Sequence, residues 1–305
     1  MAEDYPQTML ELERRFSDEA GCRAYLTALR WPAGFVCPRC ATSEALEIRR
    51  SLWRCLACRR EVSVTAGTVF QDSKLPLTLW FRAMWQITSQ KNGVSAIGLQ
   101  RVLGLGSYKT AWTVMHKLRR AMVRPGRDRL SGIIEVDEAY WGGEEQAVHG
   151  RQTNDKALIA VAAEVDGTKL GRIRLRHIPD CTPKTLHGFI AEAIQPASTV
   201  QTDGWLAYRQ LQGYVHQPVV QSHQPPDKPH LLPRVHLVIS LLKRWLMGTH
   251  QGAVSSAYLQ DYLDEFTFRF NRRTSSSRGK LFYRLAQQAV QTPPTTYDKL
   301  GDHNR

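Results

Sequence analysis

The sequence predicts a multidomain α+β protein in which a small cysteine-containing domain and a helical region precede a larger α/β domain. Three observations support this class: two Cys-x-x-Cys pairs, helical spacing of apolar residues through 64–126, and apolar strand patterns from residue 132 onward. The predicted parts are a helical lead-in at 1–30, the cysteine domain at 31–63, the helical region at 64–130, the α/β domain with C-terminal helices at 131–290, and a disordered tail at 291–305.

The charge of the chain narrows the class of partner. There are 41 Lys plus Arg against 28 Asp plus Glu, a formal net charge of +13. This excess favours a polyanion, nucleic acid first and an anionic membrane second. No apolar run approaches the roughly 20 residues of a membrane-spanning helix, and the N-terminus lacks the pattern of a secretion signal. We therefore expect a cytoplasmic protein without a membrane partner, in which disulfides are disfavoured.

The lead-in at 1–30 has apolar residues near helical spacing, from Met9 to Phe16 and again from Cys22 to Leu29. We interpret this segment as helices that pack against the rest of the protein and have no catalytic or binding role. Cys22 has no partner at metal-ligand spacing, so we expect a core thiol.

Two cysteine pairs follow, and their residues are Cys37, Cys40, Cys55 and Cys58. Two residues between the thiols let both sulfurs of a pair turn inward from one tight knuckle, and two knuckles close a four-thiolate Zn²⁺ site, as in a zinc ribbon. Strand-like residues between the pairs, within 41–54, would form the connecting hairpin. A redox pair is the weaker alternative because one pair would suffice for it. Four thiolates leave no open position, so the zinc would be structural.

The region from 64 to 126 is predicted to be helical, with one helix at 78–90. Ser95 and Ser107 occupy N-cap positions of two further helices, and Gly104 and Gly106 form the turn between them. Two short helices with a glycine turn indicate a helix-turn-helix. The second helix would be the recognition helix, with its exposed front at Tyr108, Lys109, Thr110 and Thr113 and phosphate contacts from Lys117, Arg119, Arg120 and Arg124. The alternative is a plain helical bundle with a solvated basic face.

The α/β domain begins with three predicted strands, at 133–140, 157–163 and 169–178. Next come a helix from Pro183, a strand at 199–203, a short helix, a possible strand at 214–220 and a helix at 234–247. A three-strand meander followed by helix, strand, helix, strand and helix is the order of the ribonuclease-H-like fold. The Pro-rich loop 221–233 is long enough to be a functional flap.

Two aspartates carry the predicted chemistry of this domain. Asp137 lies in the first strand and Asp203 ends the fourth, and the fold order places these two strands side by side. Neighbouring carboxylates repel each other unless cations lie between them. Two divalent ions about 3.5 to 4 Å apart could activate a water or a 3′-hydroxyl at a phosphate. Mg²⁺, or Mn²⁺ in its place, suits oxygen ligands.

The predicted helix 234–247 is apolar nearly all round, except for a polar stripe at His236, Ser240 and Lys243. We expect most of this helix to be buried and the stripe to point at a site, with Lys243 placed to hold a phosphate. The alternative is a stripe that faces solvent.

Several motifs together resemble one protein family. They are the two cysteine pairs, Val136-Asp-Glu-Ala-Tyr-Trp-Gly-Gly143, Gln201-Thr-Asp-Gly204, His236 with Lys243-Arg-Trp-Leu-Met-Gly-Thr-His250, and Tyr262-Leu-Asp-Glu-Phe-Thr-Phe-Arg-Phe-Asn-Arg-Arg273. The chain resembles bacterial DDE transposases with an N-terminal zinc ribbon, the group of insertion sequence fifteen-ninety-five, ISXO-like branch. The resemblance implies binding of terminal inverted repeats and target DNA, DNA cleavage and strand transfer, and a homo-oligomer in the active complex. It also implies metal binding by Asp137 and Asp203, and DNA positioning by Lys243.

One position departs from the family pattern. Relatives commonly carry Glu seven residues before the lysine, whereas this chain has His236. Imidazole is neutral and a poorer partner for Mg²⁺ than a carboxylate. Three readings follow: His236 is the third metal ligand, a nearby acid such as Glu265 substitutes, or the protein is a catalytically weakened or inactive DNA-binding relative. A metal nuclease of the same fold outside transposition is a further alternative.

Overall fold

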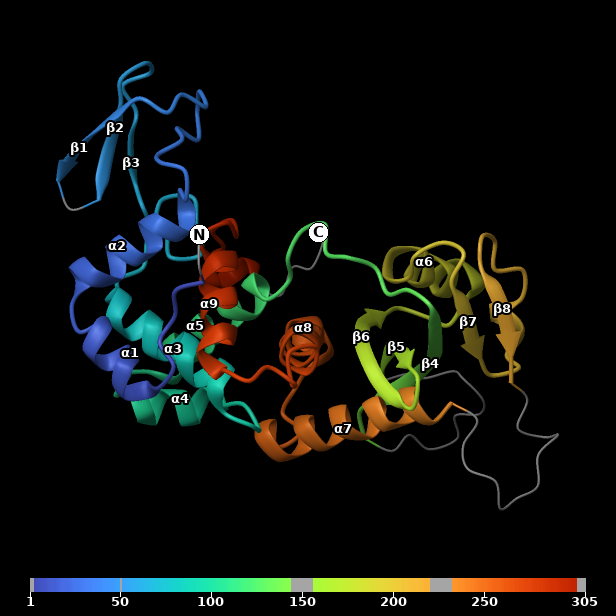
Figure 1. Ribbon diagram of the computed structural model, residues 1–305. Coiled ribbons are helices and arrows are strands. Elements are labelled where there is room, and N and C mark those ends of the chain that lie inside the picture. Colours follow the sequence, from blue (N-terminus) through green and yellow to red (C-terminus); the bar gives the residue numbers. More distant parts are fainter. Residues whose placement is uncertain (1–2, 50, 144–155, 220–231, 301–305) are drawn as a thin grey trace. The chain divides into compact units, whose positions relative to one another are not determined.

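The computed structural model describes residues 3–49, 51–143, 156–219 and 232–300. Two compact units make up the chain, one formed by Met1–Arg124 with Thr274–Arg305 and the other by Pro125–Arg273 (Figure 1). The second unit thus ends before the predicted limit of the α/β domain at 290. The reason is that helix α9 (Arg278–Ala289) packs against helices of the first unit through Leu281, Phe282 and Leu285.

Residues 1–30 form two helices, α1 (Met9–Arg15) and α2 (Glu19–Arg30). Each begins at a side-chain cap, because Thr8 and Asp18 accept hydrogen bonds from the backbone N–H groups of Glu11 and Gly21. Burial raises the pKa of Cys22 to about 12, and its side chain is fully enclosed. The prediction that Cys22 is a core thiol is confirmed.

A three-stranded antiparallel sheet carries the cysteine pairs. Its strands are β1 (Ala45–Arg49), β2 (Leu52–Cys55) and β3 (Glu61–Ser63), in the order β1-β2-β3. The first two form the predicted hairpin between the cysteine pairs. Most β1 residues are exposed, and only Val62 and Cys55 are buried in these strands. The sheet therefore contributes very little apolar core of its own.

Three helices follow: α3 (Leu77–Ser89), α4 (Ala96–Leu103) and α5 (Tyr108–Ala121). The predicted caps are confirmed, since the Ser95 and Ser107 hydroxyls accept from the N–H groups of Gly98 and Thr110. Gly104 ends α4 at φ 62°, a left-handed conformation that favours glycine. Helices α4 and α5 pack on each other and on α3, and the turn at Gly104 connects them.

The end of the described chain is ordered against the first unit. A short 3₁₀ helix, η4 (Tyr297–Lys299), follows α9, and Leu300 is fully buried. The Arg120 guanidinium of α5 donates to the carbonyls of Lys299 and Leu300 at 2.9 and 3.1 Å. The predicted disorder of 291–305 is therefore wrong for residues 291–300, because α5 supplies a packing partner; residues 301–305 lie outside the described part.

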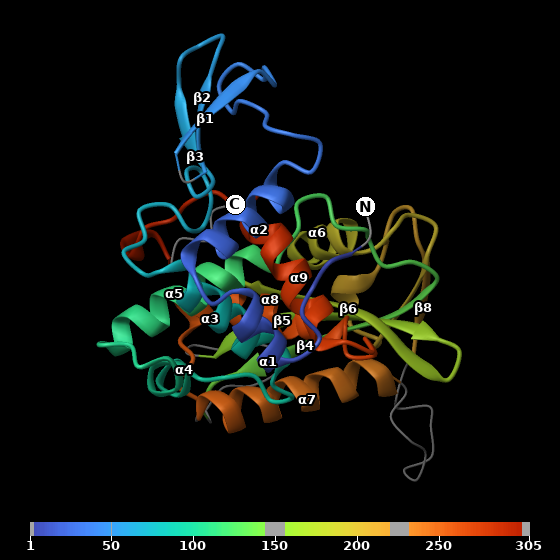
Figure 2. The same cartoon turned by 60° about the vertical axis from the view of Figure 1, so that its left-hand side comes forward.

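The second unit contains a five-stranded mixed sheet (Figure 2). Its order is β6-β5-β4-β7-β8, and its strands are β4 (Ile133–Trp141), β5 (Ala157–Asp166), β6 (Lys169–Ile178), β7 (Thr199–Thr202) and β8 (Val215–Pro218). Strands β4, β5 and β6 form an antiparallel meander, whereas β7 pairs in parallel with both β4 and β8. The predicted side-by-side placement of the first and fourth strands is confirmed.

Helices cover both faces of this sheet. One face packs against α6 (Pro183–Ala193) and the 3₁₀ helix η1 (Leu206–Tyr208), and the other against α7 (Pro233–His250), η3 (Ser256–Tyr258) and α8 (Leu259–Phe270). Side chains alternate between the faces along β4: Ile134 and Val136 pack with α6, and Ala139 packs with α7. Asp137 therefore lies on the α7 side.

Among the helices in the described ranges, none combines the length and apolar character that crossing a membrane requires.

Replacing Glu164 by glutamine is expected to destabilise the second unit. The Glu164 side chain, 12% exposed, accepts from Arg172 Nε and Nη2 at 2.9 and 2.6 Å and from the backbone N–H of Ser131 at 3.0 Å. Burial by itself would raise the pKa of Glu164, but these hydrogen bonds outweigh it and hold the pKa below the usual value. We expect a loss of about 1 to 3 kcal/mol at pH 7, measured by urea unfolding.

The pH dependence of that loss has a defined sign. A lowered native pKa adds stability above the unfolded-state value, about 4.3 for Glu, and this stability is lost as pH falls through the native pKa. The difference between wild type and Glu164→Gln should therefore shrink as the pH falls below about 4. A difference that is the same at pH 7 and in acid would contradict the assignment.

Candidate functional site

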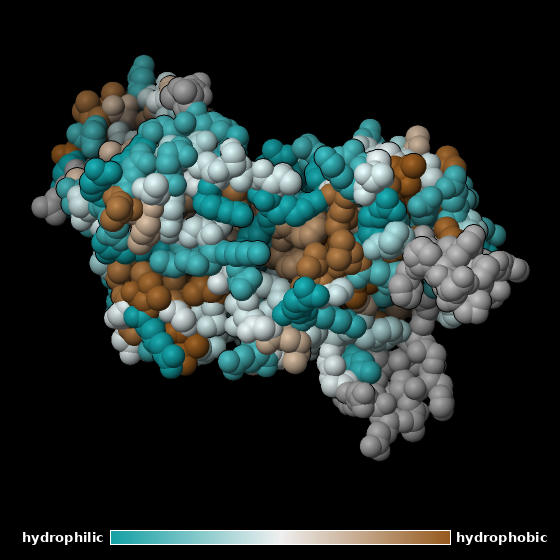
Figure 3. Space-filling model, turned by 60° about the horizontal axis from the view of Figure 1, so that its bottom comes forward, coloured by the Kyte–Doolittle hydropathy of each residue, from teal (hydrophilic) through white to brown (hydrophobic). Residues whose placement is uncertain are grey.

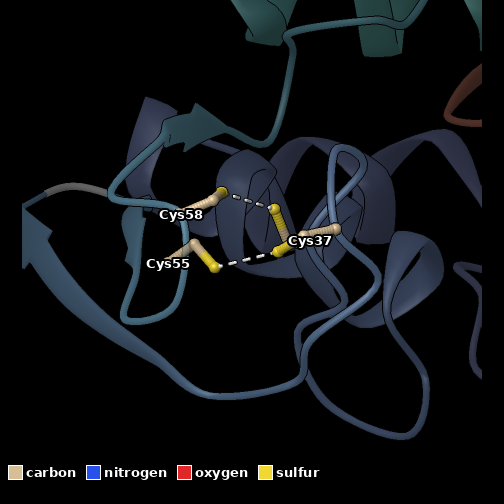
Figure 4. Close-up of side chains that lie close together, drawn as sticks. Cys37, Cys55 and Cys58 are labelled. Carbon is tan, nitrogen blue, oxygen red and sulfur yellow. Dashed lines mark hydrogen bonds between the residues drawn. The ribbon is translucent and has the colours of Figure 1, made fainter.

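The four cysteines of the ribbon converge on one point, and Figure 4 labels three of them, Cys37, Cys55 and Cys58. Their sulfur atoms all lie within 4.8 Å of one another, with 3.6 Å between Cys37 and Cys58 and 3.5 Å between Cys40 and Cys55. A tetrahedral four-thiolate zinc site with Zn–S bonds of about 2.3 Å has sulfur–sulfur edges of about 3.8 Å. All four thiols are free rather than paired in disulfides. The geometry and the donor set therefore fit a structural zinc ion.

The ionisation of these thiols favours a bound cation. The hydroxyl and the N–H of Thr42 lower the pKa of Cys40 to about 6. At Cys58 the N–H of Arg60 favours the thiolate, yet burial and the neighbouring thiols raise the pKa to about 11. Four thiolates at this spacing repel one another, so holding all four ionised requires a positive charge between them, which zinc would supply.

The α/β domain contains a second group of candidate residues, beginning with Asp137 on β4. Its side chain is 15% exposed, and Oδ1 accepts from the N–H of Glu138 at 2.9 Å. Its Oδ2 lies 3.8 Å from Nδ1 of His236, which is in the first turn of α7. The structure thus brings together two of the predicted site residues that are 99 positions apart in the sequence.

Asp203 directly follows the last residue of β7. The parallel register pairs Ile133 with Thr199 and Glu135 with Gln201, so a continuation of two residues aligns Asp137 with Asp203. The Asp203 carboxylate accepts from the N–H of Trp205 at 3.1 Å, which holds it in a tight turn. The pairing of β4 with β7 ends at Glu135 and Gln201, and Asp203 lies just beyond β7, so a level placement of the two aspartates is an extension of that register.

The charges of both aspartates influence the pKa of Tyr208. Tyr208 is fully buried on η1, and its hydroxyl donates to the buried Glu138 carboxylate. Burial raises the pKa of Tyr208 well above its usual value, and the negative charges of Glu138, Asp137 and Asp203 raise it further. No separate signal in the sequence pointed to Tyr208, because a tyrosine in a short helix after a strand is most often a core residue.

The prediction that most of α7 is buried is wrong, and its polar stripe faces solvent, as in the alternative interpretation. His236, Ser240 and Lys243 lie on the exposed side of α7, and the exposed fraction of the His236 side chain is 42%. Leu237 and Met247 are exposed on the same side at 49% and 59%, so the helix packs on the sheet through only part of its apolar surface. Figure 3 turns this side toward the reader and shows apolar side chains among hydrophilic ones. His236 still reaches Asp137 because it lies at the start of the helix.

Glu265, the alternative third ligand, lies on α8. Its carboxylate is 3.5 Å from Nη1 of Arg269. Helix α8 packs on β6 at one edge of the sheet, and β5 separates β6 from the strand that carries Asp137. In the described residues, only the four cysteines form a group of three or more potential ligands close enough to share an ion. Asp137, Asp203 and His236 do not form such a group, and neither does any set of described residues that includes Glu265.

Sequence reasoning missed Glu135, which lies two residues before Asp137 on the same face of β4. Its carboxylate contacts the beginning of α7, accepting from two backbone N–H groups. The two-residue alternation of a strand was the available signal, because it places positions 135 and 137 on one face.

The candidate DNA-contacting residues of α5 have different environments. Tyr108 and Lys109 are exposed, and Lys109 Nζ lies 3.9 Å from the centre of the Tyr297 ring. Thr113 donates to the carbonyl of Lys109, and Thr110 is hydrogen-bonded to the capping Ser107.

Three cations on the same helix are less open to solvent. Arg119 is buried, so the prediction that it contacts phosphate is wrong. Lys117 is half-buried, and burial lowers its pKa. Arg120 donates to Thr295 at 3.1 Å as well as to the η4 carbonyls. Its guanidinium is therefore used within the unit, a role that the sequence did not predict.

Comparison with known proteins gives two family models and one relative. A model described as an ISXO2-like transposase domain matches residues 129–271, and one described as a transposase zinc-ribbon domain matches residues 17–61. A protein of Halobacterium salinarum, described as an uncharacterized protein in transposable element ISH50, is 28% identical over 285 residues. The match spans 84% of this chain and 92% of that protein. No solved structure matches the chain significantly.

Proposed function

We propose a function from the premise that the chain is a member of the IS1595 family of transposases by its two matched domains. The protein binds the ends of an insertion sequence and catalyses metal-dependent DNA cleavage and strand transfer. Its DNA would be the terminal inverted repeats and the target, and the working complex would be a homo-oligomer. The observation that supports the catalytic part is the parallel pairing of β4 with β7, whose register, continued by two residues, would bring Asp203 opposite Asp137.

The catalytic domain would be ribonuclease-H-like. The support is the order β6-β5-β4-β7-β8, with an antiparallel meander, two added parallel strands and helices on both faces. In such a sheet, a carboxylate within the central strand and one just after the neighbouring parallel strand can reach one ligand.

The residues at this site suit a divalent cation. Asp137 and Asp203 supply carboxylate oxygens, the ligands that Mg²⁺ and Mn²⁺ prefer, and His236 supplies a ring nitrogen that Mn²⁺ accepts more readily than Mg²⁺. A bound divalent ion would activate a water or a 3′-hydroxyl and stabilise the leaving oxygen. Asp137 would hold its ligand oxygen toward α7, and the tight turn at Trp205 would fix the Asp203 carboxylate.

Lys243 would position the DNA. It lies seven residues after His236 on the exposed side of α7, about 10 Å along the helix at 1.5 Å per residue. An ammonium at that distance could hold a phosphate next to the scissile one.

A second candidate function is DNA binding without catalysis. The observation that favours it is His236 itself, since a neutral ring replaces the carboxylate expected at this position. An uncharged third ligand weakens the hold on Mg²⁺.

One assay separates the two functions. The full chain, loaded with zinc, is mixed with duplex oligonucleotides that carry the inverted repeats flanking its gene. With Mg²⁺ or Mn²⁺, the transposase should nick at the repeat boundary and join the 3′ end to a second duplex. Tight, salt-sensitive binding with no nicking in either metal would leave only the DNA-binding function.

Helix α5 provides a prediction about DNA binding. If it is the recognition helix, Lys109→Ala should lower the affinity for DNA and reduce the slope of log K against log salt by about one. Arg120→Ala is the matched control, because its guanidinium already bonds to Thr295 and the η4 carbonyls. Fluorescence anisotropy across a salt series measures both slopes. Equal slopes for Lys109→Ala and wild type would argue against this face of α5 as a phosphate contact.

A further inference from the structure

The first turn of α7 is held by a residue from the sheet rather than by a local cap. Glu135 Oε2 accepts from the backbone N–H groups of Arg234 at 2.7 Å and Val235 at 2.9 Å. These groups belong to the start of the helix, where N–H groups have no acceptor within the helix. The cap position is Leu232, which offers no side-chain hydrogen bond. A strand residue about 100 positions earlier in the chain thus does the work of an N-cap.

The surroundings of the Glu135 carboxylate compensate for its burial. The side chain is 2% exposed, and Oε1 lies 3.7 Å from the Arg234 guanidinium. A buried carboxylate is unfavourable unless hydrogen bonds or charges compensate it. The two N–H groups, the positive end of the helix dipole and Arg234 together provide that compensation. A serine at position 232 would offer a cap without burying a charge, but it would not fasten α7 to β4.

The contact stands directly beside the candidate active site. On β4, Glu135 and Asp137 are two residues apart on the same face; on α7, Val235 and His236 are consecutive. The Glu135 hydrogen bonds and the 3.8 Å approach of Asp137 to His236 are therefore neighbouring links between the same two elements. If the first link is removed, the start of α7 is free to shift, and the second link changes with it.

We propose that Glu135 is a positioning residue that holds the first turn of α7 on β4 and thereby keeps His236 beside Asp137. It touches neither DNA nor the reacting phosphate. The inference deepens the proposed function and rests on it, since it concerns the same site.

The first test measures catalysis in the full, zinc-loaded chain. Glu135→Gln keeps one acceptor oxygen, whereas Glu135→Ala keeps none. We expect the maximal nicking rate to fall in the order wild type, Gln, Ala, with a loss of about tenfold to a hundredfold for Ala, and the DNA dissociation constant to stay unchanged. Glu164→Gln is the matched control, because it removes a hydrogen-bonded acid from β5 that contacts Arg172 and Ser131 rather than α7. Urea unfolding compares the stability of all variants.

If Glu135→Ala nicks DNA as fast as Glu164→Gln, the positioning role is overturned. The same conclusion follows if both variants slow the reaction in proportion to their loss of stability.

The second test does not depend on activity. Histidine labelled with ¹³C at Cε1 gives a ring signal for His236, assigned by its loss in His236→Gln. At one fixed pH, Asp137→Asn should move this signal, because it removes the carboxylate beside the ring. Glu135→Ala should move the signal in the same direction, because the ring then no longer lies beside the Asp137 carboxylate. An unchanged His236 signal in Glu135→Ala would overturn the inference. If wild type fails to nick DNA but the signal moves as expected, the proposed function fails while the positioning role stands.

Discussion

Asp137→Ala is expected to lower DNA nicking and strand transfer by a thousandfold or more, roughly the effect of removing a group that acts only on the transition state. Binding of DNA ends should stay within about threefold, because loss of one carboxylate at a phosphate site removes charge repulsion rather than a contact. Asp203→Ala should behave in the same way, since the register of β4 and β7, continued by two residues, would place Asp203 opposite Asp137. The measurement is a single-turnover nicking rate in Mg²⁺ and in Mn²⁺.

The matched control for this prediction is Asp166→Ala. Asp166 belongs to the same sheet but lies exposed at the hairpin between β5 and β6. The Asp166→Ala variant should nick DNA at the wild-type rate. Nicking by Asp137→Ala at a similar rate would remove Asp137 from the mechanism.

His236 variants show whether the imidazole is a ligand. His236→Glu restores the acid that the family pattern has at this position and should raise activity in Mg²⁺ relative to Mn²⁺, because a carboxylate is the harder ligand. His236→Ala should lose activity in both metals. If both variants match wild type, His236 takes no part in the reaction.

Loss of zinc is expected to unfold the ribbon, and this effect should also be large. The strands of this domain leave most of β1 exposed and bury little apart from Val62 and Cys55, so the metal takes the place of a core. Apparent zinc-binding energies in comparable small domains are about 10 to 16 kcal/mol, far more than so small a core supplies. Cys37→Ser, or a strong chelator, should release the metal and open residues 31–63 to protease.

The control is Cys181→Ser, since Cys181 lies in the second unit, outside the four-cysteine group. The Cys181→Ser variant should retain one zinc ion per chain, as measured by atomic emission. A ribbon that stays resistant to protease after complete zinc removal would contradict a structural role for the metal.

Local signals in the sequence predicted much of the fold. The cysteine spacing gave the ribbon, and Ser95, Ser107 and Gly104 gave the boundaries of α4 and α5, because caps and left-handed turns depend on adjacent residues. The order of strands gave the pairing of β4 with β7, since an antiparallel meander followed by a helical crossover leaves few arrangements.

Features that depend on distant partners were not predictable in this way. The apolar run of α7 suggested a helix buried on most sides, yet only one side meets the sheet and Leu237 and Met247 remain exposed. The order of residues 291–300 depends on Arg120, about 180 positions earlier. The contact of Glu135 with α7 joins a strand to a helix start that has no capping side chain of its own. No local pattern carries such pairings.

The most direct measurement is the location of the catalytic ion. Crystals of the full chain bound to an end duplex, grown in Mn²⁺, should give an anomalous difference peak that contacts a carboxylate oxygen of both Asp137 and Asp203, at about 2.0 to 2.2 Å from each. The peak should be absent from crystals of Asp137→Ala. Manganese bound elsewhere, or two aspartates that share no ion while DNA fills the site, would contradict metal-dependent catalysis by this pair.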